Sequence, residues 1–242
     1  MGLYVETRVR TDLDTLWERT QDPAEHQRWD LRFTEITYLP AEPGAEDGPR
    51  RFRYAVRVPP FPAVAGTGVS AGERHRAGGD RVSALRFASP HPLSPLAEGS
   101  GYWRYLPQDG EDVEDGDEAG RGIRFLTGYD YRPRWGRFGL VADRLVFRPL
   151  MGWATAWSFD RLRLWCEHGL TPERARAHWL LELAARALLV AFCVGHPLAL
   201  AAGCAAALLV PPSPRTPAAR RCLRTPPDRS RAPRLLATLE RP

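Results

Sequence analysis

The sequence of 242 residues lacks lysine and asparagine entirely and has only two isoleucines. All 34 basic residues are therefore arginine, a bias that we attribute to a GC-rich genome, because no physical demand removes lysine from a whole protein surface. The abundance of arginine is for this reason weak support for nucleic-acid binding, and we expect no nucleic-acid partner. The composition is otherwise that of a globular protein, with 43% hydrophobic and 26% charged residues.

Cysteine is also scarce, and its spacing argues against two kinds of site. The four cysteines form no C-x-x-C pair and two lie in an apolar stretch, so they fit a reducing compartment better than a disulfide framework. Cys166 and His168 are close in sequence, but no further ligand residues cluster with them, and we expect no metal site.

Motifs for nucleotide binding and covalent catalysis are missing. Gly66-x-Gly68-x-x-Ala71 resembles a dinucleotide fingerprint, but Pro59-Pro60-x-Pro62 stands where the preceding strand would have to be. The chain has neither G-x-S-x-G nor a P-loop, and we expect no cofactor. His26 is interpreted as a helix-surface residue, and no catalytic residue is assigned.

The chain begins without a targeting pattern, and its charge is uneven. Met1–Glu6 has no basic region before an apolar core and no myristoylation pattern, which predicts a cytoplasmic body. Residues 1–170 hold 23 arginines and 25 acidic residues, whereas residues 171–242 hold 11 arginines and 4 acidic residues. A basic tail of this kind suits an anionic partner, such as phospholipid or nucleic acid, or is simply solvated.

The first 30 residues predict one strand and two short helices. Leu3–Val9 alternates with a period of two, as a half-buried strand does. Thr11-x-x-Asp14 resembles a capping box and predicts a helix directly after it. Asp22 followed by Pro23 predicts the start of a second helix, which ends near Trp29.

The middle of the chain reads as β structure, with clusters of proline and glycine between strands. The predicted strands are Arg50–Val58, Val64–His75, Arg81–Phe87, Gly101–Leu106 and Gly122–Arg132.

From about Phe138 the hydrophobic period becomes helical, and a long helix is predicted over residues 143–167. The order of a strand, two short helices, further strands and one long helix predicts an α+β fold, with the helix lying across a curved antiparallel sheet. The stripe predicted to face the sheet comprises Val146, Leu150, Trp153, Trp157 and Leu164.

Two stretches resemble the START-related helix-grip superfamily (SRPBCC), which includes polyketide cyclase/dehydrase-like and lipid-transfer domains. V-E-T-R-V from Val5 and D-P-x-x-H-x-x-W-D from Asp22 are similar to its first strand and paired helices. T-G-Y-D-Y-R-P-R-W-G and D-R-L-V-F-R-P-L-M-G-W-A-T-A-W-S-F-D-R-L-R-L-W, within residues 125–167, are similar to a bacterial subgroup of unassigned function. The resemblance covers residues 1–170. It implies a sheet wrapped around a long C-terminal helix, with an elongated apolar cavity. It identifies no reaction, because this fold hosts carriers, sensors and enzymes alike.

Strand parity and helical phase predict which side chains line such a cavity. Aromatic rings with polar ends suit a flat or acyl ligand that has one polar end, and Arg104 would be its anion partner. If strand Gly101–Leu106 has the opposite orientation, Trp103 and Tyr105 face inward in place of Tyr102 and Arg104. The alternative for all the predicted lining residues is that they form an ordinary hydrophobic core without a cavity. The predicted lining is Phe52, Tyr54, Tyr102, Arg104, Phe125, Tyr129, Tyr131, Trp153 and Trp157.

Residues 187–210 contain no formal charge, and at ~1.5 Å per residue they could cross a bilayer. However, Pro197 interrupts the segment, and a single crossing would carry the arginine-rich tail outside. We predict an apolar helical segment or hairpin over residues 171–210, with both ends on the cytoplasmic face of a membrane. The alternative is packing on the domain. Residues 211–242, rich in proline and arginine, are predicted to be disordered.

These patterns leave three functions open. The first is binding or carriage of a hydrophobic small molecule or lipid in the cavity, at a membrane surface. The second is a polyketide cyclase- or aromatase-like enzyme using the same cavity. The third is a non-catalytic, membrane-associated interaction module whose cavity is filled by its own side chains. Turnover separates the second from the first, and the size of the cavity separates the third from both.

Overall fold

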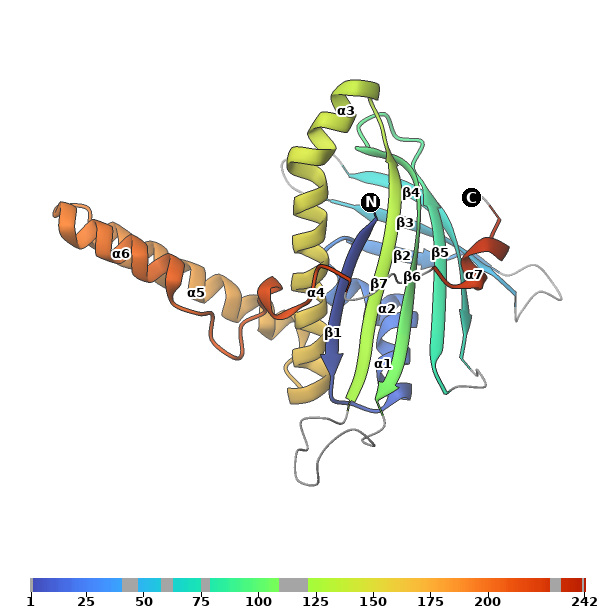
Figure 1. Ribbon diagram of the computed structural model, residues 1–242, viewed down its shortest axis with the longest axis horizontal. Helices are drawn as coiled ribbons and strands as arrows, with labels where there is room; N and C mark the ends of the chain where they lie inside the picture. Colours follow the sequence, from blue (N-terminus) through green and yellow to red (C-terminus); the bar gives the residue numbers. More distant parts are fainter. Residues whose placement is uncertain are drawn as a thin grey trace.

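The computed structural model describes residues 2–40, 48–57, 63–74, 79–108, 122–226, 232–240 and 242. Seven strands form one antiparallel sheet in the order β1-β7-β6-β5-β4-β3-β2 (Figure 1). The predicted strands are present with shifted ends, and a short strand, β2, joins them; Val58 and His75 lie outside the described residues. The strands are β1 (Leu3–Val9), β2 (Glu35–Tyr38), β3 (Arg50–Val56), β4 (Val64–Glu73), β5 (Arg81–Ala88), β6 (Leu96–Gln108) and β7 (Gly122–Pro133).

The sheet curves around the long helix α4 (Arg148–His168), which packs on β1 and faces the concave side of the sheet (Figure 1). The rings of Phe125 on β7 and Phe159 on α4 stack at 4.6 Å between centroids. The hydroxyls of Tyr129 and Thr155 lie 3.0 Å apart across the same interface. This is the helix-grip architecture, and the predicted α+β fold is confirmed.

Two short helices close one end of the sheet, where the core is most completely buried. α1 (Leu13–Gln21) is capped by Asp12, whose carboxylate accepts from the amide of Thr15, so the capping box predicted at Thr11 is wrong. α2 (Pro23–Trp29) begins as predicted, with the carboxylate of Asp22 accepting from an amide of the first turn. Large side chains with no more than 3% exposure fill this end: Val5, Val9, Leu16, Trp29, Tyr105, Ile123, Phe125, Phe159 and Leu162.

The helical part after β7 is continuous but not uniform. α3 (Gly136–Ala142) leads through a π-helical turn, η3 (Asp143–Phe147), into α4. A Cβ atom at Gly139 would lie 1.5 Å from the carbonyl oxygen of Arg134, so only glycine permits this approach of the helix to the chain before it. α4 ends where Gly169 takes the left-handed conformation, at φ 62°.

The apolar stripe predicted to face the sheet does not face it. Val146 and Leu150 are 64% and 55% exposed, and the rings of Trp153 and Trp157 pack on Trp179 of the next helix. The sheet-facing positions are Thr155 and Phe159, on the opposite side of the helix. The prediction failed because α4 has two apolar sides, and a helical wheel cannot tell which one meets the sheet.

After α4 the chain forms a helical hairpin, the arm, from α5 (Pro172–Phe192) and α6 (Pro197–Leu209). The arm projects from the lower end of α4 away from the sheet (Figure 1). α5 ends at Phe192 and α6 begins at Pro197, so the bend includes the His196-Pro197 pair at which the sequence predicted it. At the base of the arm Arg186 of α5 donates to the carbonyl oxygen of Val210, 2.9 Å away. Within the described residues, no helix combines the length and apolar character that a membrane crossing requires.

The chain then returns to the body, and the disorder predicted for the tail is wrong for the residues that the structure describes there. The fully buried carboxylate of Asp160 accepts from the amide of Ala218 and from Arg221, at 2.8 and 2.9 Å. Leu223 pairs with Glu6 of β1 through two backbone hydrogen bonds. The composition suggested disorder, but an acceptor buried on α4 and small side chains in the tail fix this segment, which includes η4 (Ala219–Arg221).

A last short helix, α7 (Arg234–Thr238), covers part of the convex face of the sheet (Figure 1). Its Leu235 and Leu236 pack on a cluster of side chains from β4, β5, β6 and β7. Arg86 on β5 donates to the carbonyl oxygen of Leu236. The two faces of the sheet are therefore distinguished by their partners: α1, α2 and α4 on the concave face, and α7 on the convex one.

Candidate ligand-binding site

Five of the nine predicted lining residues lie on the concave face. Phe125, Tyr129 and Tyr131 alternate along β7 toward the helices, each with a ring or hydroxyl contact to η3 or α4. Phe52 and Tyr54 lie on β3, and the ring of Tyr54 contacts Phe33 and Phe87 at 5.8 and 6.3 Å between centroids. All five are buried.

Tyr102 and Arg104 do not line the interior, and this prediction is corrected. Tyr102 belongs to the cluster on the convex face beneath α7, where its ring lies over Gly128. Trp103 and Tyr105 take the concave positions on β6, and Trp103 contacts the ring of His26 at 5.0 Å. The alternation of side chains along β6 shows only that either Tyr102 and Arg104 or Trp103 and Tyr105 face inward. Which pair does so depends on the side of the sheet on which α1, α2 and α4 pack.

Trp153 and Trp157 also lie outside the concave surface. They form a cluster with Trp179 of α5, with ring centroids 5.6 to 6.5 Å apart. The guanidinium of Arg161 lies over Trp157 at 5.3 Å. This cluster joins the arm to α4, so its role is to position the arm.

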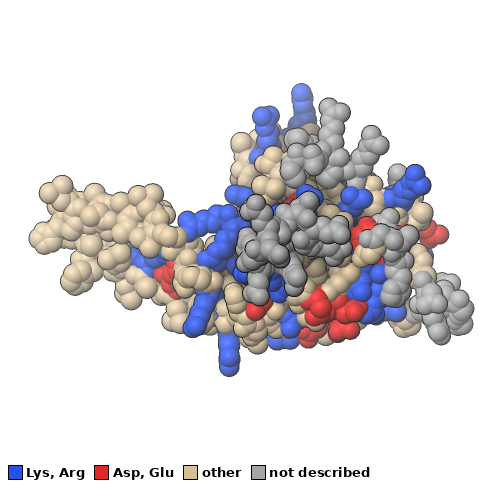
Figure 2. Space-filling view, turned by 60° about the horizontal axis from the view of Figure 1, so that its bottom comes forward, with Lys and Arg blue, Asp and Glu red and all other residues tan. Residues whose placement is uncertain are grey.

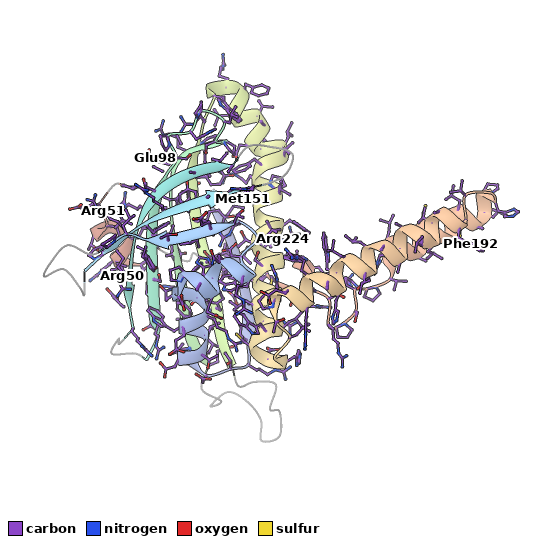
Figure 3. The ribbon with its side chains drawn as sticks, turned by 180° about the vertical axis from the view of Figure 1, so that it is seen from behind. Arg50, Arg51, Glu98, Met151, Phe192 and Arg224 are labelled. Atoms are coloured by element: carbon purple, nitrogen blue, oxygen red, sulfur yellow. The ribbon has the colours of Figure 1, made fainter. Side chains whose placement is uncertain are left out.

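Toward α3, the side chains of the concave face are less buried than those at the end closed by α1 and α2. Apolar side chains there remain partly exposed although strand alternation and helical phase point them inward. Met151, one turn before Thr155, lies on the side of α4 that faces the strands (Figure 3). We call this surface the upper concave face; its half-buried members are Phe33, Ile36, Tyr38, Leu85, Phe87, Phe147 and Met151.

A buried charged cluster borders the upper concave face. Arg32 donates to both carboxylate oxygens of Asp30, at 2.9 and 2.6 Å, and Nε2 of His26 lies 3.0 Å from the same carboxylate. The guanidinium of Arg32 lies 5.3 Å from the ring centroid of Tyr129. Asp30 is 1% exposed, and the Arg32 side chain is 10% exposed. A charged pair is thus placed where β7, α4 and the segment after α2 meet.

The electrostatics of this cluster keep both partners ionised. Burial by itself raises the pKa of Asp30, but the charge of Arg32 and the hydrogen bonds from His26 and Arg32 outweigh it and hold that pKa well below its usual range. Burial also disfavours the charged form of Arg32 and so lowers its pKa. The carboxylate of Asp30 raises that pKa by more, and Arg32 stays charged. The cluster therefore presents a fixed cation beside an aromatic surface.

The tyrosines of the site stay neutral and can serve as hydrogen-bonding groups. Burial raises the pKa of Tyr54 to about 12, and burial also raises the pKa of Tyr129 despite the charge of Arg32. Tyr131 hydrogen-bonds to the carboxylate of Asp143 on η3, and Arg148 lies over its ring at 4.9 Å. These groups can orient a polar end of a ligand, and none of these tyrosines is poised as a phenolate base.

Sequence reasoning missed Asp30 and Arg32, and it placed His26 wrongly on a helix surface. His26 is 8% exposed and is surrounded by the rings of Trp29, Phe33 and Trp103. One signal was present: His26 and Asp30 are four residues apart, which puts them on one side of a helical turn. The spacing could not show that this side faces the interior.

No family model matches the chain. It is 46% identical over 172 residues to the uncharacterized membrane protein YndG of Bacillus subtilis (strain 168), which covers 71% of this chain. The chain spans only 59% of the length of that relative.

Distant likenesses to solved structures also exist. They include TTHA0849 from Thermus thermophilus (15% identity, TM-score 0.44, 62% of this chain and 87% of that one). The di-domain ARO/CYC StfQ of the steffimycin biosynthetic pathway has 14% identity and a TM-score of 0.45, covering 68% of this chain and 51% of that one. A START superfamily protein from Mycobacterium smegmatis has 13% identity and a TM-score of 0.41, covering 63% and 91%. The strand order and the position of α4 by themselves identify the helix-grip fold.

Proposed function

We propose that the protein binds an amphipathic hydrophobic molecule, such as a single-chain lipid, on the upper concave face. The observation that carries this proposal is that inward-pointing apolar side chains stay partly exposed there, while those at the other end of the sheet are fully buried. Burying a ligand against them would remove apolar surface from water, at roughly 25 cal/mol per Å².

The polar end of the ligand would lie near Arg32 and Tyr129. The sequence predicted an arginine in this role but chose Arg104, which lies on the convex face. Arg32 takes its place, because it is buried, charged and stacked on a tyrosine of the concave face. Thr155 and the hydroxyl of Tyr129 add polar atoms at the same point. A carboxylate or a polar headgroup fits this environment.

We further propose that the arm attaches the protein to the cytoplasmic face of a membrane. Its outer part shows neither basic nor acidic side chains in Figure 2, and arginines gather where it meets the body. Residues 187–210 carry no charge, and Leu188, Phe192 and Leu198 are 69%, 91% and 86% exposed. The relative from Bacillus subtilis is described as a membrane protein. A hairpin that enters one leaflet needs no span of the bilayer.

The binding surface is tested by a matched pair of variants. Met151→Trp would fill the upper concave face, whereas Leu150→Trp adds the same bulk on the exposed side of α4. We expect Met151→Trp to weaken binding of dansyl-undecanoate at least about 10-fold in a fluorescence titration, because about 1.4 kcal/mol of lost contact has that effect. Leu150→Trp should leave the affinity unchanged. Equal affinities for the two variants would contradict the proposed site.

A further inference from the structure

A second exposed apolar surface lies at the N-terminal end of α4, where α3 leads into it, whereas the arm follows the C-terminal end (Figure 1). The α3–η3 face consists of large apolar side chains on α3, η3 and the first turn of α4, each more than half exposed. They are Phe138, Leu140, Val141, Leu145, Val146 and Leu150. Six such residues within thirteen positions exceed the scattered apolar side chains that a protein surface normally shows.

The exposed charge of this segment is positive. Residues 136–150 contain four charged side chains: buried Asp143, Arg148, which forms ion pairs with Asp143 and Asp130, and Arg137 and Arg144. Arg137 and Arg144 are exposed on the same turns as the apolar residues. Exposed apolar side chains interspersed with arginine are typical of segments that lie in the interface of an anionic bilayer.

The α3–η3 face is continuous with the arm. Leu150 is followed one turn later by Trp153, whose ring lies 6.5 Å from that of Trp179 on α5. Leu180 and Leu183, next on α5, are 53% and 44% exposed. Apolar surface therefore extends from α3 along α4 and onto the arm.

The inner side of the same segment borders the candidate binding site. Asp143 hydrogen-bonds to Tyr131, and the ring of Phe147 contacts Tyr131 at 5.5 Å. Phe147 also belongs to the upper concave face. The π-helical turn thus separates an outer surface of apolar residues and arginine from the edge of the interior.

We propose that the α3–η3 face is a second membrane-contacting surface, which lies in the interface of an anionic bilayer and places the edge of the upper concave face next to lipid. It extends the proposed attachment through the arm, but it rests on different residues. A ligand taken from a bilayer would then enter the interior beside η3 without crossing bulk water.

The experiment compares an environment-sensitive NBD label at two positions of the full-length chain. Leu145→Cys and Phe192→Cys are each labelled in a chain that also carries Cys193→Ala and Cys204→Ala. Burial raises the pKa of Cys166 to about 11 and of Cys222 to about 12, so these two thiols stay protonated and label slowly at neutral pH. The emission is recorded with phosphatidylcholine vesicles and with vesicles that contain one quarter phosphatidylglycerol.

We expect a blue shift at both positions on addition of the anionic vesicles, and a smaller one at Leu145→Cys with neutral vesicles. A shift at Phe192→Cys alone would overturn this inference and leave the attachment through the arm intact. A shift at Leu145→Cys alone would support the inference and contradict the proposed attachment through the arm. No shift at either position contradicts both. A shift at Leu145→Cys that follows protein concentration without vesicles would assign the face to a second copy of the chain and overturn the inference.

Discussion

Replacing Phe192 and Leu198 together by serine should weaken binding to anionic vesicles about 100-fold. Both side chains lie in the uncharged outer part of the arm, where they are 91% and 86% exposed (Figure 3 labels Phe192). Transfer of each from water to the bilayer interface contributes at least roughly 1.5 kcal/mol, and about 3 kcal/mol together correspond to that factor. Co-sedimentation of the full-length protein over a series of vesicle concentrations measures the change.

The control is a pair of exposed leucines on the body. Leu31 follows the end of α2, and Leu223 pairs with Glu6 of β1; they are 47% and 45% exposed. The Leu31→Ser, Leu223→Ser variant should bind vesicles like the unaltered protein. If both double variants lose the same vesicle affinity, the arm is not the membrane-attaching segment, and the binding depends only on the total exposed apolar surface of the protein.

Replacing Asp30 by asparagine should lower the free energy of unfolding by roughly 3 kcal/mol at neutral pH, because the buried cation of Arg32 loses its counter-charge. The pKa of Asp30 is depressed in the folded protein, so its contribution is complete above its ordinary value of about 4 and is lost as the pH falls below it. The difference between the variant and the unaltered protein should therefore shrink in acid. Urea denaturation at pH 7, 5 and 3.5 measures it.

Asp130→Asn provides the comparison for this experiment. Its carboxylate lies at the surface, 3.6 Å from Arg148, and such a pair contributes at most about 1 kcal/mol. A loss for Asp30→Asn no larger than that for Asp130→Asn would mean that the cluster is solvated, and it would not then offer a preorganised cation to a ligand.

Most of the architecture was accessible from local patterns, since strand alternation, N-caps and helix-ending residues act over a few positions. Asp22 with Pro23, and Gly169 at the end of α4, each determine an end by backbone chemistry that is visible in the sequence. Pro197 determines the bend of the arm in the same way. The curved antiparallel sheet with α4 lying across it followed from the order of elements along the chain and from the fold that the sequence resembled.

The orientation of amphipathic elements could not be obtained in this way. The alternation along β6 allows either Tyr102 or Trp103 to face inward. Hydrophobicity does not choose between them, because helices cover both faces of the sheet and both side chains are buried. α4 likewise meets the sheet on one side and α5 on the other, so a stripe containing Trp157 looked like the inner one. The charged cluster depends on where α2 packs, and Arg32 has no local signal. Tertiary contacts decided each of these cases.

Photocrosslinking can locate a hydrophobic ligand bound to the full-length protein. A long-chain fatty acid with a diazirine near its methyl end is bound to the full-length protein, and the complex is irradiated. Peptide mass spectrometry then locates the adducts. If the ligand binds on the upper concave face, we expect adducts on peptides that contain Leu85, Phe87 or Met151, and we expect Met151→Trp to abolish them. Adducts confined to residues 187–210 of the arm and unchanged by Met151→Trp would contradict binding on the upper concave face.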